Sequence, residues 1–219
     1  MVKLAVLVSG GGTNLQSIID SIEAGALDAK LLVVLSDNPG AYALERAKKH
    51  SIPTEVVSKD DFPGTDAFNA EIARRLNSYG VELLALAGYM RIIGPAVLEA
   101  FPMRVINIHP SLLPSFPGLD VQRKALEHGV KLSGCTVHFV DAGVDSGPVI
   151  IQAAVPVLDD DTVESLARRI LAEEHRIYPK AIQLFSEGRL TVKGRRVSVR
   201  GAVASGTKLE NPESSIIEG

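Results

Sequence analysis

Asn107 and His109 carry side chains whose types and spacing could do chemistry. They lie two positions apart at the end of an apolar run and directly before a proline-rich segment. An asparagine amide can donate to a developing oxyanion, and a histidine can give or take a proton near neutral pH. Together they favour the transfer of an acyl-type carbon. Taken alone, His109 is equally compatible with a capping or structural histidine.

A third group is expected to orient the imidazole, and Asp145 is the candidate. It lies in a glycine-containing segment, 141–148, that can bring the carboxylate close to His109. A carboxylate beside the ring would favour the charged imidazolium. The alternative is an ordinary turn aspartate, which the local sequence context favours.

Two other kinds of catalytic site find less support in the sequence. The Gly-x-Ser-x-Gly pattern of a nucleophilic serine is absent, and Ser111 and Ser115 lie among prolines. The histidines lack the paired spacing of metal ligands, and a lone cysteine offers no cluster. We therefore expect no catalytic metal; the histidines are His50, His109, His128, His138 and His175.

A run of three glycines, Gly10 to Gly12, follows the first apolar run and precedes a helix-like segment. Free backbone N–H groups at such a helix start predict a phosphate site. Leu15 stands where a dinucleotide fingerprint needs glycine, and the Gly-Lys-Ser/Thr of a nucleoside triphosphate loop is missing, which disfavours NAD and ATP. The alternative is a tight turn in which Thr13 or Asn14 caps the helix.

The elements that must position these groups alternate in the first half of the chain. Continuous apolar runs indicate strands that are covered on both faces, as in a parallel sheet, whose carboxyl ends collect ligands. The expected strands are 4–8, 31–35, 83–87 and 105–108, and the expected helices are 14–23, 42–50 and 66–79.

The second half predicts a different arrangement. A short helix, 121–127, precedes two β-rich stretches, 131–140 and 149–155, that resemble a hairpin. A long helix is expected from the capping sequence at 161–164 to residue 186, with Gly188 marking its end. The predicted fold is a single α/β domain, 1–200: a Rossmann-like, mostly parallel sheet flanked by helices, with a C-terminal β-hairpin and long helix. Residues 201–219 are predicted to be a flexible tail.

Composition limits the function classes. The 219 residues are 46% hydrophobic, enough for one compact core, and no apolar run is long enough to span a bilayer. The net charge of −3 disfavours nucleic acid as a partner. A lone Cys135 and no signal-peptide pattern predict a cytoplasmic location. Whether the chain forms a homodimer is left open.

Several motifs together resemble the folate-dependent formyltransferase family, over residues 1 to 200. The resemblance is specific because it joins segments from both ends of the chain. The motifs are Ser9-Gly10-Gly11-Gly12-Thr13-Asn14-Leu15-Gln16, Asn107-Ile108-His109-Pro110-Ser111-Leu112-Leu113-Pro114, His138-Phe139-Val140, Asp145-Ser146-Gly147-Pro148 and Glu174-His175-Arg176-Ile177-Tyr178-Pro179.

The resemblance implies formyl transfer from 10-formyltetrahydrofolate to the amine of glycinamide ribonucleotide in purine synthesis. The amine would attack the formyl carbon directly, with no covalent enzyme intermediate. Asn107 and protonated His109 would stabilise the oxyanion, and Asp145 would keep His109 charged. The acceptor nucleotide would be held by Gly12, Thr13, Asn14 and Glu174. Without the resemblance, Glu174 would be read as a solvated helix residue.

The resemblance also implies a folate pocket. Core packing is the alternative for its two isoleucines. Many relatives carry a basic residue at the position of Thr65, where it helps to hold the folate tail, and this chain departs from that pattern. The implied folate-binding residues are Met90, Arg91, Ile92, Ile93, Asn107, Val140, Asp141, Ala142, Gly143, Val144 and Asp145.

Three rival functions share parts of these motifs. Methionyl-tRNA formyltransferase shares the catalytic trio but normally adds a C-terminal RNA-binding domain, for which we expect no room here. Formyltetrahydrofolate hydrolase carries an extra N-terminal regulatory domain, whereas here we expect the first strand to begin at Lys3. A non-catalytic protein that binds a phosphate ligand is the third; the intact trio disfavours it.

Overall fold

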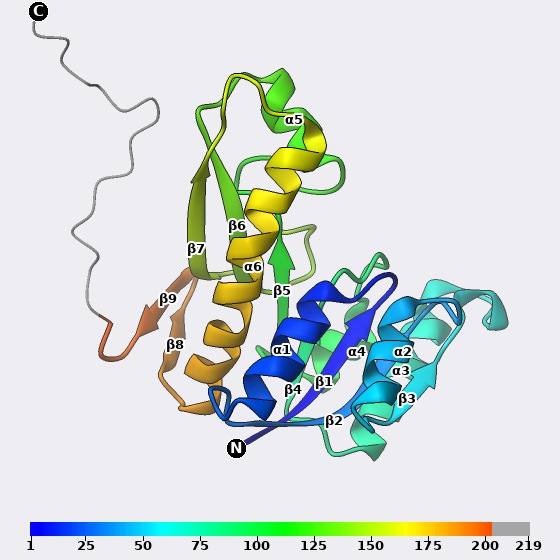
Figure 1. Cartoon of the computed structure of the whole chain (residues 1–219). Coiled ribbons are helices and arrows are strands. Elements are labelled where there is room, and N and C mark those ends of the chain that lie inside the picture. The colour runs from blue at the N-terminus through cyan, green and yellow to red at the C-terminus, as the bar shows by residue number, and fades with distance from the viewer. Residues whose placement is uncertain (203–219) are drawn as a thin grey trace, which may run out of the picture.

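The structure is a computed structural model that describes residues 1–202 (Figure 1). Most of the segment expected to be a flexible tail, 201–219, therefore lies outside the described residues, and its flexibility stays a prediction.

The elements alternate as expected through the first half of the chain. They are β1 (Val2–Val8), α1 (Thr13–Glu23), β2 (Ala29–Ser36), α2 (Tyr42–Lys49), β3 (Thr54–Val56), a 3-10 turn η1 (Lys59–Asp61), α3 (Thr65–Ser78), β4 (Leu83–Leu86), α4 (Pro95–Ala100) and β5 (Val105–His109). After them come α5 (Val121–Glu127), β6 (Leu132–Phe139), β7 (Val149–Pro156), α6 (Val163–Ser186), β8 (Leu190–Lys193) and β9 (Arg196–Val199).

Within residues 1–202 the strands form one sheet of nine, in the order β3-β2-β1-β4-β5-β6-β7-β9-β8. Strands β1 to β5 pair in parallel, and β6 pairs antiparallel with both β5 and β7. The mostly parallel sheet and the β6–β7 hairpin are thus confirmed. Because β1, β4 and β5 are neighbours, the segments that follow them meet at one edge of the sheet.

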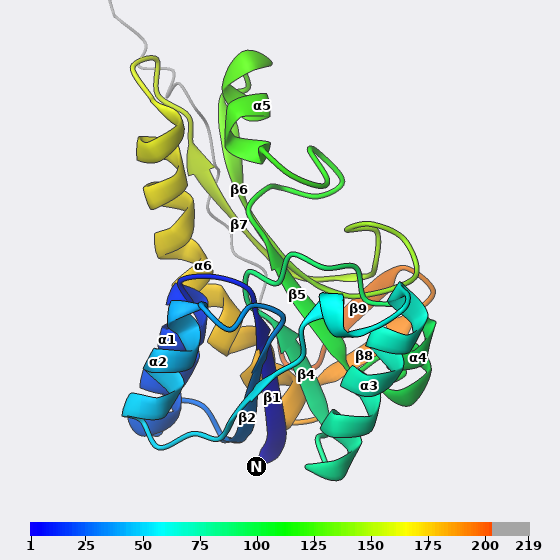
Figure 2. The ribbon, with the colours of Figure 1, turned by 90° about the vertical axis from the view of Figure 1, so that its right-hand side faces the viewer.

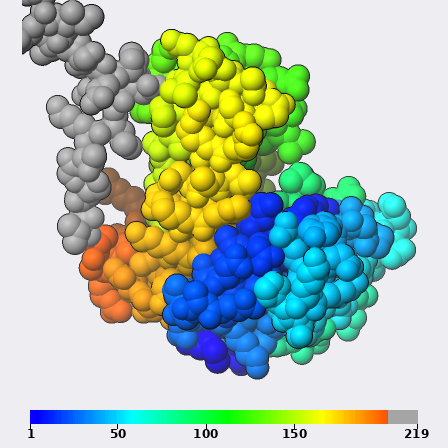
Figure 3. Space-filling model, viewed as in Figure 1, coloured from blue at the N-terminus to red at the C-terminus, as the bar shows by residue number. Residues whose placement is uncertain are grey.

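Two hydrophobic cores cover the two faces of the sheet. On one face alternate residues of β1, such as Leu4 and Val6, pack with helices α1, α2 and α6. On the other face Ala5 and Leu7 pack with α3 and α4. Figure 2 shows these two helical layers on either side of the strands, and Figure 3 shows α6 running up the first face beside the N-terminal helices. This double coverage explains the continuous apolar runs.

Helix α6 begins at a capping box. The Thr162 side chain accepts from the Ser165 N–H, and the Ser165 hydroxyl accepts from the Thr162 N–H. Further along, the fully buried Tyr178 donates from Oη to the Leu86 carbonyl (2.9 Å) and lies 3.2 Å from that of Ile106. The helix is therefore attached to β4 and β5 by a hydrogen bond as well as by packing. Gly188, at a φ of 61°, follows its end as predicted.

Some elements were not expected from the sequence. Strand β3 has three residues, and α4 is a six-residue helix that starts at a proline. Strands β8 and β9 alternate between half-buried and exposed residues, and β9 pairs with β7 to extend the sheet. They were missed because half-buried, alternating strands lack the continuous apolar pattern that marked the others.

Candidate formyl-transfer site

Strand β5 presents Asn107 and His109 on the same face of the sheet. Side chains along a strand alternate between the two faces of the sheet, so Asn107 and His109 lie on the same face as Val105. Val105 belongs to the core beneath α3 and α4, whereas Ile106 and Ile108 lie on the opposite face, which α6 covers. His109 is 5% exposed and Asn107 is half-buried. The two candidate residues therefore face one space at the carboxyl end of β5.

Asp145 reaches this space from the connection between β6 and β7. Its Oδ2 lies 3.3 Å from His109 Nδ1 and accepts from the Gly118 N–H at 2.8 Å. Its backbone has a φ of 49°, in the left-handed region that a non-glycine residue seldom adopts. The carboxylate thus joins the imidazole to the segment that follows β5. An ordinary exposed turn aspartate would make neither contact.

Both nitrogens of His109 face hydrogen-bond acceptors. Nε2 lies 2.9 Å from the Phe116 carbonyl oxygen, which can only accept, and Nδ1 faces the Asp145 carboxylate. A neutral ring can donate from only one nitrogen, whereas the imidazolium donates from both. The surroundings of His109 are therefore those of a charged ring.

A buried polar network, which the sequence did not reveal, holds the segment after β5. Thr136 on β6 donates from its hydroxyl to the Ser111 carbonyl and accepts from the Leu113 N–H. Gln152 on β7 donates to the Leu113 carbonyl and to the Thr136 hydroxyl. These bonds fix the backbone from which Phe116 and Gly118 reach His109 and Asp145.

The glycine run connects β1 to α1 and leaves the start of that helix without a side-chain cap. Gly12 has a φ of 72°, and a Cβ there would lie 2.5 Å from that of Ala43, so this glycine is required by the turn. At Gly10 and Gly11 a Cβ would meet nothing within 4 Å. Packing accounts for one of the three glycines and leaves the other two open to a ligand.

Arg46, on α2, is a cation beside this loop that sequence reasoning missed. Its Nε donates to the Gly11 carbonyl at 2.8 Å, and its Nη1 donates to Gln16 Oε1 at 3.2 Å. The guanidinium adds positive charge next to the free N–H groups at the start of α1, which favours an anion there.

Glu174 lies buried against the start of α1. It is 6% exposed, so its interpretation as a solvated residue is wrong. Asn14 Nδ2 donates to its Oε2 at 2.7 Å, and burial raises the pKa of its carboxyl, an effect that this hydrogen bond partly offsets. The Oδ1 atom of Asn14 is buried and has no hydrogen-bond partner among residues 1–202. A buried acceptor without a donor is costly unless a ligand donates to it.

The segment after β4 is joined to the glycine loop by Asp37. Its carboxylate accepts from Ser9 Oγ at 2.6 Å and from Arg91 Nε at 2.7 Å, while Ser9 Oγ accepts from the Met90 N–H. Asp37 was not singled out in the sequence. It connects the segment predicted to bind folate to the segment predicted to bind phosphate.

The residues predicted to bind folate have different surroundings. Met90 and Ile92 are 64% and 71% exposed, whereas Ile93 is buried in the core with α3 and α4. In the second segment Val144 is exposed, and Asp141 Oδ1 accepts from the Gly143 N–H and the Ser146 hydroxyl. Folate roles for these residues and for Ala142 and Val140 stay predictions.

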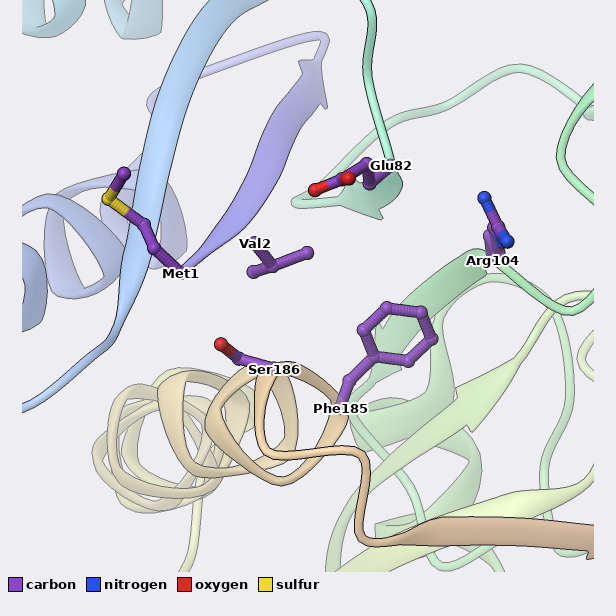
Figure 4. Close-up of a pocket in the computed structure, with 6 residues that line it drawn as sticks. All are labelled: Met1, Val2, Glu82, Arg104, Phe185 and Ser186. Atoms are coloured by element: carbon purple, nitrogen blue, oxygen red, sulfur yellow. The ribbon is translucent and has the colours of Figure 1, made fainter.

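A hollow of about 250 Å³ lies away from these groups, at the amino ends of the strands (Figure 4). The hollow is lined by Met1, Val2, Glu82, Arg104, Phe185 and Ser186.

In residues 1–202 no cluster of histidine, cysteine and acidic side chains could hold a metal ion. No helix in that part of the chain is long and apolar enough to cross a membrane.

Known proteins resemble this chain over most of its length. It is 58% identical to the solved structure of glycinamide ribonucleotide transformylase 1 from Symbiobacterium toebii, with a TM-score of 0.90, over 91% of this chain and 94% of that one. It is 43% identical over 193 residues to phosphoribosylglycinamide formyltransferase of Haemophilus influenzae, covering 88% of this chain and 91% of that protein.

A longer relative is the trifunctional purine biosynthetic protein adenosine-3 of Drosophila pseudoobscura pseudoobscura. It is 48% identical over 198 residues, which cover 90% of this chain and 14% of that protein. A family model described as formyl transferase matches residues 2–182. The chain therefore belongs to the formyl transferase family.

Proposed function

We propose that this protein transfers the formyl group of 10-formyltetrahydrofolate to the amine of glycinamide ribonucleotide, a step of purine biosynthesis, and works in the cytoplasm. The observation that carries the proposal is the contact between His109 and Asp145, next to Asn107. A donor amide and an imidazole held by a carboxylate suit a reaction in which negative charge develops on oxygen. The names of the relatives supply the acceptor nucleotide and the transferred formyl group, and the family resemblance implies the folate donor.

The proposed reaction needs no covalent enzyme intermediate. The amine nitrogen bonds to the formyl carbon, whose oxygen becomes negatively charged, and the bond from that carbon to the folate nitrogen then breaks. The amine loses a proton and the folate nitrogen gains one. Asn107 and His109 donate to the oxygen while Asp145 stabilises the charged imidazole. In the present structure the Phe116 carbonyl is the acceptor of the Nε2–H, and the formyl oxygen would take its place.

For the acceptor we propose a phosphate held by the backbone of Gly12, Thr13 and Asn14. Three features support it: the uncapped start of α1, the guanidinium of Arg46 and the two glycines with open space. The buried Asn14 Oδ1 and Glu174 would then accept from hydroxyl groups of the same nucleotide. The folate would lie near the segment after β4, on the side of Met90, Ile92 and Val144.

A direct assay tests the proposal. The protein is incubated with both substrates, and release of tetrahydrofolate is followed by absorbance. Release that depends on glycinamide ribonucleotide supports the function; no release contradicts it. Release of tetrahydrofolate without any acceptor would indicate a hydrolase. Formylation of methionyl-tRNA would indicate a methionyl-tRNA formyltransferase.

A further inference from the structure

A second buried histidine, His138, lies beside the proposed formyl site. It is on β6 directly opposite Asn107 in the antiparallel pairing with β5, and it is 2% exposed. Its Nδ1 lies 2.8 Å from the Phe139 carbonyl oxygen. Because a carbonyl can only accept, Nδ1 must carry a proton.

The other ring nitrogen faces the catalytic amide. Nε2 lies 3.3 Å from Asn107 Nδ2. If the ring is neutral with its proton on Nδ1, Nε2 offers a lone pair that accepts from the amide nitrogen. Burial, the largest effect, lowers the pKa of His138, and the charge of His109 acts in the same direction. The hydrogen bond to the Phe139 carbonyl and the charges of Asp145 and Asp141 oppose them, and the net shift is downward, towards the neutral ring that this hydrogen bond needs.

The two histidines have opposite surroundings. His109 faces two acceptors, which suits a charged ring, whereas His138 faces one acceptor and one donor, which suits a neutral ring. His138 Nε2 also lies 3.7 Å from Asp145 Oδ1. A proton on Nε2 would draw the carboxylate towards His138 and away from His109. A neutral His138 leaves Asp145 to His109.

We propose that His138 is a positioning residue that holds the amide of Asn107 with its nitrogen, not its oxygen, against β6. The amide of asparagine has nearly the same shape after a half-turn, so only its hydrogen bonds set its orientation. A half-turn would bring Oδ1 against the lone pair of Nε2, two acceptors facing each other. In the observed orientation Nδ2 uses one N–H for His138 and keeps the second for the formyl oxygen. This inference rests on the proposed function.

Two substitutions separate the two ring nitrogens. In His138→Gln the side-chain oxygen can reach the position of Nε2 and accept from Asn107. In His138→Asn the shorter amide can still donate to the Phe139 carbonyl but leaves nothing at the position of Nε2. We expect His138→Asn to lower kcat by about 10- to 100-fold, less than the loss of a whole oxyanion donor. We expect His138→Gln to stay within about fivefold of the wild type, and KM for the nucleotide to change less than twofold in both.

Nitrogen-15 NMR of the free protein gives a second readout that needs no turnover. The proposal expects His138 Nε2 to be unprotonated and Nδ1 to be protonated between pH 6 and 8. It also expects the Asn107 side-chain amide resonance to shift in His138→Asn and to stay near its wild-type position in His138→Gln.

Several results would overturn the positioning role. The first is a proton on His138 Nε2 in the wild type. The second is an equal kcat in the wild type and His138→Asn. The third is an equal loss of kcat in both variants while their melting temperatures show that both are folded. A wild-type protein that turns over no substrate would instead contradict the proposed function, while the NMR result would still decide the orientation of the amide.

Discussion

The two halves of the proposed site are built in different ways. The glycine loop is continuous in sequence, and the phosphate contacts proposed there come from the backbone of residues 12–14. The formyl-transfer centre joins side chains from β5, β6 and the 140–148 connection. A backbone site depends on local conformation, whereas a side-chain site depends on charge and on contacts between distant segments. Substitutions in the glycine loop should therefore lower stability, whereas substitutions in the formyl-transfer centre should lower kcat.

The largest effect is expected at Asp145. Asp145→Asn removes the charge that stabilises the His109 imidazolium but keeps an oxygen for the Gly118 N–H, so kcat should fall by about 10²- to 10³-fold, as for the loss of one transition-state hydrogen bond. The melting temperature should change little. Steady-state kinetics and thermal unfolding measure both. Asp159→Asn, which changes an exposed aspartate paired with Lys131, is the control and should leave both unchanged. A nearly full rate in Asp145→Asn would contradict the role of the carboxylate.

Gly12→Ala should act on the other half. The left-handed backbone costs a non-glycine residue about 1–2 kcal/mol, and the contact with Ala43 adds overpacking of about 1–3 kcal/mol. We expect the melting temperature to fall by about 5–10 °C and KM for the nucleotide to rise, with a smaller change in kcat. Gly10→Ala meets no atom and should melt like the wild type. Equal melting of the two variants would show that the turn does not require Gly12.

Glu174→Gln should raise stability and weaken nucleotide binding. Burial raises the pKa of Glu174 above the ordinary glutamate value of 4.5, so between the ordinary and the raised pKa the folded protein binds more protons than the unfolded chain. The free energy of unfolding therefore falls as pH rises through that window, and a neutral glutamine escapes this loss. At pH 7 we expect Glu174→Gln to melt at a higher temperature than the wild type, with a smaller difference at pH 4.

The control for this prediction is the neighbouring Glu173→Gln, where the carboxylate is partly exposed and pairs with Arg176. It should not raise the melting temperature. A Glu174→Gln protein that is less stable than the wild type at pH 7 would show that the charged carboxylate is favoured in the fold.

The smallest effect is expected at Thr65, an exposed residue at the start of α3. Thr65→Arg supplies the basic side chain that the family resemblance leads us to expect here, and an exposed ion pair with the folate tail would be worth about 0.2–1 kcal/mol. KM for the folate should fall by at most about fivefold, with kcat unchanged. Thr65→Gln, which adds length without charge, is the control. An equal KM in both variants would place the folate tail away from α3.

The sequence predicted the parts of the molecule whose signals are local. Strands buried on both faces left continuous apolar runs, and the glycines before α1 indicated an uncapped helix start, where an anion site stays a prediction. Strands β8 and β9 lacked such a run. Glu174 had an available signal: it lies on the stripe of α6 that also carries Ile170 and Ile177, so its burial could have been inferred from helical spacing.

The contacts of the formyl-transfer centre could not be predicted in this way. His138 faces Asn107 only because β6 runs antiparallel to β5 in one particular register. Asp145, whose backbone has a positive φ, reaches His109 from the connection between β6 and β7. Arg46 and Asp37 act on loops that are distant in sequence. Such contacts depend on tertiary structure, for which a single sequence has no periodic signal.

The hydroxyl of Tyr178 has a mechanical consequence. Through it, the helix that carries Glu174 is attached to Leu86, the last residue of β4, and to Ile106, the residue of β5 that precedes Asn107. The two substrates would thus be held by parts of one rigid frame. In a bimolecular transfer, an error of about 1 Å between the reacting atoms can cost a hundredfold in rate. In the proposed transfer, the buried phenol of Tyr178 would thereby help to set the distance between the attacking amine and the formyl carbon.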